Sequence, residues 1–533
     1  MTQLVQLTLP DQPKPDAVMD FTPLPDGASV KLMLVYPNVQ RVRTPQLGVA
    51  VLSACAKQIG ADVCLFDITG IKRGTEFDAF KAMVEREKPD ILGYSVRSNE
   101  WPLTQKMLAW AKSLGITQII GGPHPTHAPG ETIGDCDAIV LGEGEGAIMD
   151  ILRAVAKRKP LAGIPNTWVN VDGEVVKTDK RNLIHNLDEV PLPDWKIFGD
   201  IHYRDSYIAG IMGGVDMVAA IEGSRGCPFT CTYCSNHALM DSYSGQGRWR
   251  REKSPERIVE ELAAFREAFG SLDFVYWVDE IWLTGVERLK HFRDLYKKEI
   301  AAPFSIMERP ECITEEKIEI IADAGLHYVA IGLESGDEDL RTSLLDRRTK
   351  VNVLIEAFTL PKKYNVKVHA FTMLGLPGQD IASMLKTWDI MRKIMPTSAQ
   401  FSIFYPLKGT KLYDQTIQMG MYDPSDTADN YYSGTVLTQD GIDNALLQRY
   451  QTLFDRYANK PGWPAAVAFH FYRKVIPAYK LRFVTGPAIK SRLRYYRARW
   501  NTLRAKGMVA VAKRLAKAVV ESPQALFTSR GAA

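Results

Sequence analysis

Short apolar segments alternate with helical patterns twice along this chain of 533 residues, and this alternation is what most restricts its fold. Residues 31–36 and 91–95 are runs of the apolar residues that buried strands favour, and residues 47–59 place apolar side chains at helical spacing. Buried strands separated by helices pair in parallel, because each helix returns the chain to the same edge of the sheet. The sequence therefore predicts the α/β fold class.

The first series predicts a doubly wound (Rossmann-like) sheet, and the second predicts a partial (β/α)6 barrel. The strands expected in the first series are residues 31–36, 61–66, 91–95, 118–120 and 138–141. Those expected in the second series are residues 217–221, 274–278, 304–307, 328–331, 367–372 and 399–404. One barrel helix is expected to begin at Ser254 and Pro255, because a serine N-cap followed by proline is typical of helix starts.

The same signals divide the chain into five parts. The expected parts are an N-terminal arm (1–29), the doubly wound domain (30–160), an irregular connector (161–215), the barrel (216–420) and a helical, basic C-terminal region (421–533). No apolar run reaches the roughly 18 residues that a membrane span needs, and no secretory signal pattern is apparent. We therefore expect a cytoplasmic protein.

Glycines follow the strands of the first series, at the edge where parallel sheets bind ligands. A backbone without side chains lets a large flat ligand approach closely. The residues expected at this edge are Ser95, Gly121, Gly122, Gly142, Glu143 and Gly144. The pattern predicts a nucleotide or cofactor site, and the alternative is that these glycines serve only tight turns.

Three cysteines, Cys227, Cys231 and Cys234, stand within eight residues directly after the first barrel strand. Three thiolates at this spacing can bind one metal centre, and they are one short of the four that complete a 4Fe–4S cluster. One iron would then stay open for a small chelating molecule. The alternatives are a zinc site with His237 as a further ligand and a disulfide that leaves one thiol over.

The spacing Cys-x3-Cys-x2-Cys, with Tyr233 just before the last cysteine, resembles that of the radical S-adenosylmethionine (SAM) enzymes. The resemblance implies that Cys227, Cys231 and Cys234 hold a 4Fe–4S cluster whose open iron takes the amino and carboxylate groups of SAM. It also implies SAM contacts from polar residues near the cysteines and at the ends of barrel strands. These residues are Tyr233, Asp279, Glu280, Arg309, Glu334 and Ser335. Which of the two adjacent acids binds the amino group stays open, and Glu334 has the alternative of a salt-bridged barrel residue.

A second resemblance lies upstream, in residues 45–48, 121–126 and 142–145. These segments are similar to the cobalamin-binding domain that is fused in front of many radical SAM enzymes, of the class B methyltransferase type. The resemblance assigns the glycine-bearing edge to cobalamin. An Asp-x-His-x-x-Gly motif is absent from the sequence, and His124 and His127 do not fit it, so we expect cobalt to have no lower histidine ligand.

The combination predicts a cobalamin-dependent radical SAM enzyme that methylates an unactivated carbon through a 5′-deoxyadenosyl radical and methylcobalamin. An alternative keeps both cofactors but performs an oxidative cyclisation, or another rearrangement without methyl transfer, on a lipid or tetrapyrrole-like substrate. A methylthiotransferase acting on transfer RNA is disfavoured, because the other cysteines are too dispersed for a second cluster. A cobalamin sensor is disfavoured too, because it needs no cluster with an open iron. The expected partners are a small-molecule or lipid substrate and an electron donor such as flavodoxin or ferredoxin.

Positive charge is concentrated in the C-terminal region. From residue 461 onward there are 15 Lys and Arg against the single acid Glu521, which gives +14 and leaves −10 for residues 1–460 of a chain whose net charge is +4. Apolar residues from Ile489 to Val519 recur at helical spacing beside these basic residues. Such a surface suits the anionic inner face of a membrane or docking onto the acidic body, and nucleic acid is the least supported interpretation.

Overall fold

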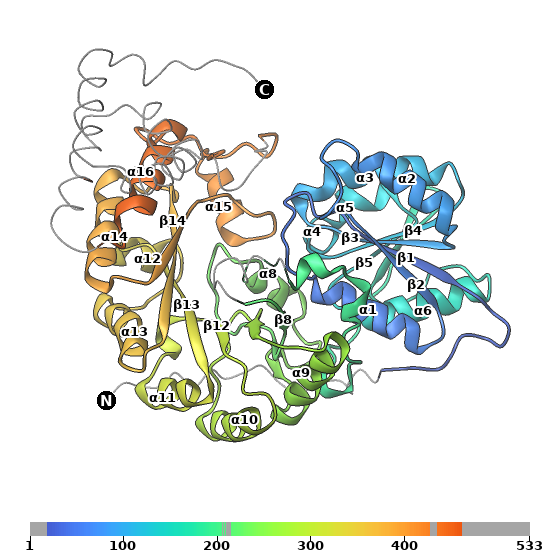
Figure 1. Ribbon diagram of the computed structural model, residues 1–533. Coiled ribbons are helices and arrows are strands. Elements are labelled where there is room, and N and C mark those ends of the chain that lie inside the picture. Colours follow the sequence, from blue (N-terminus) through green and yellow to red (C-terminus); the bar gives the residue numbers. More distant parts are fainter. Residues whose placement is uncertain are drawn as a thin grey trace, which may run out of the picture.

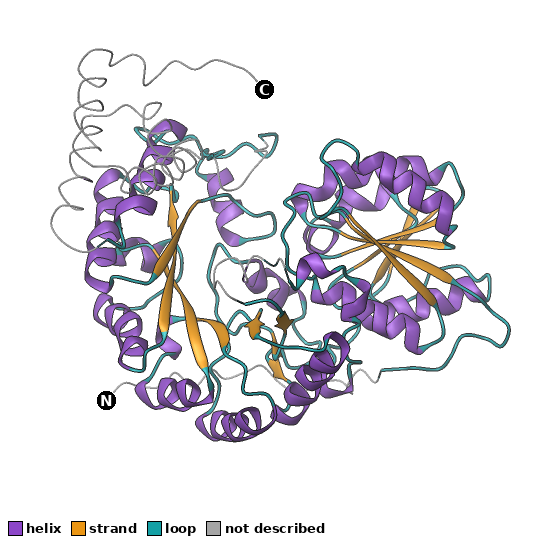
Figure 2. Cartoon of the chain, viewed as in Figure 1, coloured by secondary structure: helices purple, strands orange, loops and turns teal. Residues whose placement is uncertain are grey.

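The computed structural model describes residues 19–204, 206, 208, 215–426, 434–460 and 469. These residues form two α/β domains that lie side by side, each with strands inside and helices outside (Figures 1 and 2). The predicted α/β class, with a doubly wound first domain and a parallel sheet in the second, is confirmed.

Within the described residues, seven strands form the first sheet, in the order β2-β1-β3-β4-β5-β6-β7. They are β1 (Lys31–Tyr36), β2 (Asp62–Asp67), β3 (Ile91–Ser95), β4 (Thr117–Gly121), β5 (Ala138–Val140), β6 (Thr167–Val171) and β7 (Glu174–Lys177). The helices are α1 (Leu47–Gln58), α2 (Glu76–Glu87), α3 (Trp101–Lys112), α4 (Pro123–His127), α5 (Pro129–Thr132) and α6 (Glu145–Ala156), with 3-10 turns η1 (Ser98–Glu100) and η2 (Ile133–Asp135). The strands β1 to β5 pair in parallel.

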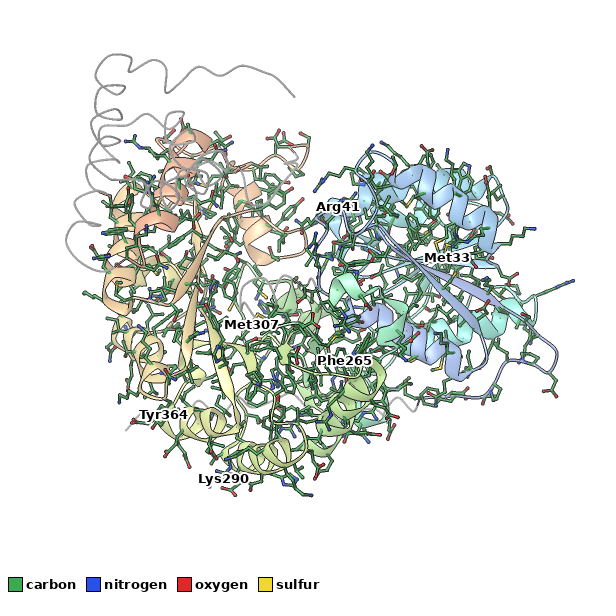
Figure 3. All side chains as sticks on the ribbon, viewed as in Figure 1. Met33, Arg41, Phe265, Lys290, Met307 and Tyr364 are labelled. Atoms are coloured by element: carbon green, nitrogen blue, oxygen red, sulfur yellow. The ribbon has the colours of Figure 1, made fainter. Side chains whose placement is uncertain are left out.

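Both faces of this sheet are covered, which is why its strands are apolar throughout. Along β1, Leu32 and Leu34 pack into the core that contains α1 and α6, whereas Met33 and Val35 pack into the core that contains α2 and α3. Figure 3 shows Met33 inside this domain. The strand order changes direction at β1, so the carboxyl ends of β1 and β3 flank the place where such sheets bind ligands.

The stretch expected to be an irregular connector contains a β-hairpin. Strand β6 pairs antiparallel with β5 and with β7, so the hairpin extends the first sheet. The turn residues Asp172 and Gly173 have φ values of 52° and 93°, which is the left-handed geometry of a tight hairpin turn. An Asp-Gly pair between apolar segments is a hairpin signal, and the sequence prediction missed it. The rest of the connector holds the 3-10 turns η3 (Leu187–Glu189), η4 (Trp195–Ile197) and η5 (Asp200–His202).

The second sheet has the order β15-β14-β13-β12-β11-β8 over the described residues, and its strands pair in parallel. The strands are β8 (Val218–Ile221), β11 (Phe274–Trp277), β12 (Phe304–Glu308), β13 (Leu326–Glu334), β14 (Lys367–Leu374) and β15 (Ser398–Ile403). Strands β9 (Ser224–Arg225) and β10 (Arg251–Glu252) form a separate antiparallel pair. The helices are α8 (Ser235–Ser242), α9 (Pro255–Phe269), α10 (Val286–Glu299), α11 (Glu315–Ala324), α12 (Glu338–Ser343), α13 (Val351–Lys363), α14 (Ile381–Ile394), α15 (Lys411–Gln418) and α16 (Asn444–Tyr457), with the 3-10 turn η6 (Pro310–Cys312). This is the predicted partial barrel.

The barrel is incomplete between its edge strands β8 and β15, and the first domain lies across this opening (Figure 1). After β8, the Arg225 side chain pairs with Glu145 of the first domain at 2.7 Å. After β15, Lys408 pairs with Glu131 in the short helix α5. Both loops that follow the edge strands are therefore fastened to the first domain, and the carboxyl ends of the two sheets face each other.

Only part of the C-terminal region lies within the described residues. Helix α16 packs against β15, where the rings of Phe454 and Phe401 have centroids 5.0 Å apart. The amphipathic pattern predicted from Ile489 to Val519 and the first 18 residues of the N-terminal arm lie outside the described residues. Among the helices that are described, none has both the length and the apolar character needed to cross a bilayer.

The N-cap of α9 gives a direct test of the local fold. The hydroxyl of Ser254 accepts a hydrogen bond from the backbone N–H of Arg257 at 3.0 Å. Replacing Ser254 with alanine removes this acceptor, and we expect the free energy of unfolding to fall by about 1 kcal/mol. Urea unfolding followed by circular dichroism measures the loss. Thr75→Ala is the matched control, because Thr75 precedes α2 without capping it; an equal loss there would contradict the assignment.

Candidate active site

The three cysteines lie in the loop between β9 and α8, at the carboxyl end of the barrel. Gly226 begins the loop with a φ of 87°, and a Cβ at this position would overlap the backbone of Trp249. The indole N–H of Trp249 donates to the carbonyl oxygen of Cys227 at 2.9 Å. The loop therefore has a defined path, and α8 begins directly after Cys234.

The donor set of the loop fits a cluster better than the alternatives. All seven cysteines are free, so the disulfide interpretation is wrong. Among the described residues no three His, Cys, Asp or Glu side chains converge on one ion, the three cysteines included. His237, the further ligand of the zinc interpretation, contacts the ammonium of Lys411 at 3.2 Å. Burial raises the pKa of the Cys227 thiol to about 12 and raises that of Cys234 as well. Thiolates in this loop thus need a positive centre, which an iron–sulfur cluster supplies.

The adjacent acids after β11 have different surroundings. The carboxylate of Asp279 is buried and accepts hydrogen bonds from the backbone N–H of Gly223 at 2.9 Å and from the Ser224 hydroxyl. Burial raises the pKa of Asp279 to about 7. Glu280 is exposed, lines the cavity between the domains and is hydrogen-bonded to the Asn236 side chain. Asp279 therefore fastens the loop after β8, whereas Glu280 is accessible to a ligand.

The residues at the end of β12 are directed toward neighbouring loops. Buried Glu308 accepts hydrogen bonds from the backbone N–H groups of Trp282 at 3.0 Å and Leu283 at 2.6 Å, which orders the segment after β11. The side chain of Arg309 is also buried, and its Nη1 donates to the sulfur of Cys231 at 2.8 Å. The predicted SAM contact Arg309 thus points to a cluster ligand in this structure.

Arg347 connects several predicted SAM residues. Its Nη1 donates to the Tyr233 hydroxyl at 3.0 Å and to the Glu334 carboxylate at 3.1 Å. Its Nη2 donates to the carbonyl oxygen of Gly332 at 2.8 Å. Glu334 therefore forms an ion pair with Arg347, which fits the alternative that it is a salt-bridged barrel residue. Ser335 is fully buried. Contacts of Tyr233, Glu334 and Ser335 with SAM stay predictions.

A cavity of about 360 Å³ lies between the two domains, within the size range of small-molecule sites. Its wall on the first domain includes every residue predicted there: Ser95, Gly121, Gly122, Gly142, Glu143 and Gly144. Its wall on the barrel includes Arg225, Asn236, Tyr243, Arg251 and Glu280. The cavity therefore joins the glycine edge to residues just before and after the cysteine loop, and the three cysteines themselves do not line it.

The glycines of this wall have different roles. A Cβ at Gly121 would meet nothing closer than the Val140 side chain and carbonyl at 4.0 Å, so its absence leaves space for a ligand. At Gly122, which has a φ of 98°, a Cβ would lie 2.9 Å from the backbone nitrogen of Val96, and at Gly142 it would overlap the Tyr243 hydroxyl. Gly121 fits the predicted open surface, whereas Gly122 and Gly142 are explained by protein contacts.

Glu143 forms the centre of a charged contact between the domains. Its carboxylate pairs with Arg251 at 2.8 Å and with Arg225 at 3.3 Å, and it accepts a hydrogen bond from the backbone N–H of Ile184. Although burial opposes its ionisation, Arg251 and Arg225 lower the pKa of Glu143. The Tyr243 hydroxyl accepts a hydrogen bond from the Glu143 backbone N–H at 2.9 Å. Sequence reasoning did not find Tyr243, Arg225 or Arg251, because no local motif marks them.

Among the described residues that line the cavity there is no histidine. His124 is buried in α4, where burial lowers its pKa to about 4. His127 packs against the backbone of Gly409, where an added Cβ would lie 2.9 Å from its Nδ1. Both side chains therefore contact other parts of the protein and do not line the cavity.

Each domain matches a known family. Residues 38–152 match the B12 binding domain, and residues 221–389 match the Radical SAM superfamily. The chain is 27% identical over 401 residues to an uncharacterized methyltransferase of Pyrococcus horikoshii, covering 73% of this chain and 83% of that protein. It is 24% identical over 405 residues to an anaerobic magnesium-protoporphyrin IX monomethyl ester cyclase of Rubrivivax gelatinosus, covering 72% and 70%.

Two solved structures share the complete two-domain fold. One is the cobalamin-dependent SAM radical enzyme OxsB with aqua-cobalamin and SAM bound, with a TM-score of 0.62, 17% identity, and 84% of this chain and 70% of that one covered. The other is the radical SAM methyltransferase TsrM from Kitasatospora setae with cobalamin and a 4Fe–4S cluster bound, with a TM-score of 0.60, 17% identity, and 86% and 92% covered. At these identities the likeness establishes the fold.

The fold and the cysteine loop thus define a radical SAM enzyme. More narrowly, the chain belongs to the radical SAM enzymes that carry a cobalamin-binding domain ahead of the barrel. Its cofactors are a 4Fe–4S cluster, SAM and cobalamin, as the sequence resemblance implied.

The contact at Glu143 generates a prediction about stability. Glu143→Gln keeps the shape of the side chain but leaves buried Arg251 without its carboxylate partner, whereas Arg225 keeps Glu145 and Glu222. We expect a loss of about 3 kcal/mol in the free energy of unfolding. Urea unfolding of the full chain measures it. The control is Glu287→Gln, whose partner Lys290 lies on the outer surface of α10 (Figure 3). That exposed pair is expected to contribute little, and equal effects of the two substitutions would refute the role of Glu143.

Proposed function

We propose that this protein transfers a methyl group from SAM to an unactivated carbon atom. The observation that carries the proposal is the cavity shared by the two domains, whose lining includes Glu280 of the cysteine-bearing domain and Gly121 of the cobalamin-binding domain. When bound, the cluster and SAM supply a radical able to remove hydrogen from carbon, and cobalamin supplies a methyl group. A relative named as a methyltransferase over most of both chains supports this outcome.

The residues of the chain have separate tasks in this proposal. Cys227, Cys231 and Cys234 would hold the cluster in the loop between Gly226 and Asn236, two residues that line the cavity. Glu280 is the acid with access to the cavity, and it is positioned by Asn236 to accept hydrogen bonds from the ammonium of SAM. The domain contacts at the two edges of the barrel would exclude water from the space between them.

The outcome is tested by product analysis. We expect reconstituted enzyme, given a low-potential reductant, cobalamin and SAM with a labelled methyl group, to release 5′-deoxyadenosine and a product that carries the label. Mass spectrometry detects both. Formation of 5′-deoxyadenosine with an unlabelled, oxidised product would instead support the cyclisation for which a relative is named. Absence of 5′-deoxyadenosine would reject both functions.

The two acids after β11 give a residue-level test. We expect Glu280→Gln to weaken SAM binding about tenfold or more, because the neutral amide loses a charge-assisted hydrogen bond to the ammonium. Equilibrium binding of SAM to cluster-loaded protein measures the effect. Asp279→Asn is the matched control, since its carboxylate is committed to Gly223 and Ser224. A larger loss of SAM affinity for Asp279→Asn would reverse the assignment.

We also propose a reducing, cytoplasmic setting with a flavodoxin or ferredoxin as the electron donor. The seven free cysteines support a reducing compartment. The substrate would be a small molecule or a lipid. The basic residues beyond residue 460 would bind an anionic membrane surface.

A further inference from the structure

Arg309 is a buried cation that contacts the cysteine loop. Its Nη1 donates to the sulfur of Cys231 at 2.8 Å, and its guanidinium carbon lies 3.8 Å from the centre of the Phe229 ring. Phe229 and Cys231 belong to the same loop, so one guanidinium contacts it by a hydrogen bond to sulfur and by stacking on an aromatic face. Arg309 is only 7% exposed.

The orientation of this guanidinium is held from the other side by Glu311. The Nε and Nη2 atoms of Arg309 donate to the two carboxylate oxygens of Glu311 at 3.2 and 2.9 Å. Glu311 also accepts a hydrogen bond from the Thr349 hydroxyl. Although burial opposes its ionisation, these hydrogen bonds from Arg309 and Thr349 lower the pKa of Glu311 to about 2, so it stays an anion. A two-point contact of this kind fixes the plane of the guanidinium.

We propose that Arg309 tunes the reduction potential of the 4Fe–4S cluster by donating a charged hydrogen bond to the thiolate of Cys231. The Nε, Nη1 and Nη2 atoms of its guanidinium each donate a hydrogen bond to Cys231 or Glu311. This is a different role from the SAM contact expected from the sequence. The inference depends on the cluster and not on methyl transfer, so it can be tested without substrate.

The direction of the effect follows from electrostatics. Reduction adds one electron to the cluster from a one-electron donor, which is dithionite in the test below, and no bond is broken. The cluster and its thiolates then carry one more negative charge. A fixed cation hydrogen-bonded to a ligand sulfur stabilises this reduced form more than the oxidised form, because burial weakens screening by water. Arginine keeps its proton in both states, so the potential gains no pH dependence from this group.

The experiment is a redox titration of anaerobically reconstituted full-length protein without substrate, followed by electron paramagnetic resonance of the reduced cluster. We expect Arg309→Gln to shift the midpoint potential to a more negative value and to change the resonance signal. Arg309→Lys keeps the charge but loses the planar fork, and a smaller shift in the same direction is expected. Arg348→Gln is the control, because Arg348 is 81% exposed and pairs with Asp346.

The possible results of the titration separate a role in tuning the potential from a role in holding the loop. A wild-type potential in Arg309→Gln with full iron and sulfide content would overturn the proposal, as would an equal shift in Arg348→Gln. If both Arg309 variants are folded by circular dichroism but fail to retain a cluster, Arg309 holds the loop and does not tune the potential. Failure of methyl transfer with an intact potential shift would count against the proposed function alone.

Discussion

The charged contact at Glu143 is the interaction on which the arrangement of the two domains depends. Glu143 and Glu145 follow the last parallel strand of the first sheet, and Arg225 and Arg251 lie on the antiparallel strands β9 and β10, before and after the cysteine loop. Buried charges are stable only when paired, and moving β9 and β10 away from the first domain would break the ion pairs of Arg225 and Arg251 with Glu143 and Glu145. The contact therefore sets the distance between the cobalamin edge and the cluster loop.

The charged contact at Glu143 also restrains the cysteine loop, because its partners are close to that loop in the chain. Arg225 stands two residues before Cys227, and Tyr243 follows the helix that starts after Cys234. Both ends of the cluster-bearing segment are thus anchored to the loop around Gly142, one by an ion pair and the other by a hydroxyl group. A glycine at position 142 is needed because any side chain would displace the Tyr243 ring. At the opposite edge of the barrel, Lys408 and Glu131 close the remaining side.

Much of the fold was predictable because strands, helix caps and turns depend on the residue types of short segments. The run 31–36 was predicted from apolar residues alone and is β1, and the N-cap at Ser254 has the hydrogen bond that its residue type favours. The hairpin at Asp172 and Gly173 was missed, although its turn residues carry a recognisable signal. The predicted glycines line the cavity, and among them Gly121 leaves open space there, whereas Gly122 and Gly142 serve close protein contacts.

The sequence by itself determined the α/β class, the order of the domains and the cysteine loop, because strand periodicity and the spacing of three thiols are properties of short segments. Only the tertiary structure decided that Glu280 and not Asp279 faces the cavity, and that Arg309 reaches Cys231 across a separation of 78 residues. The physical reason is that these choices depend on strand register and on which buried charges find partners. Strand register and the pairing of buried charges are determined when distant segments pack together, and no local sequence pattern predicts them.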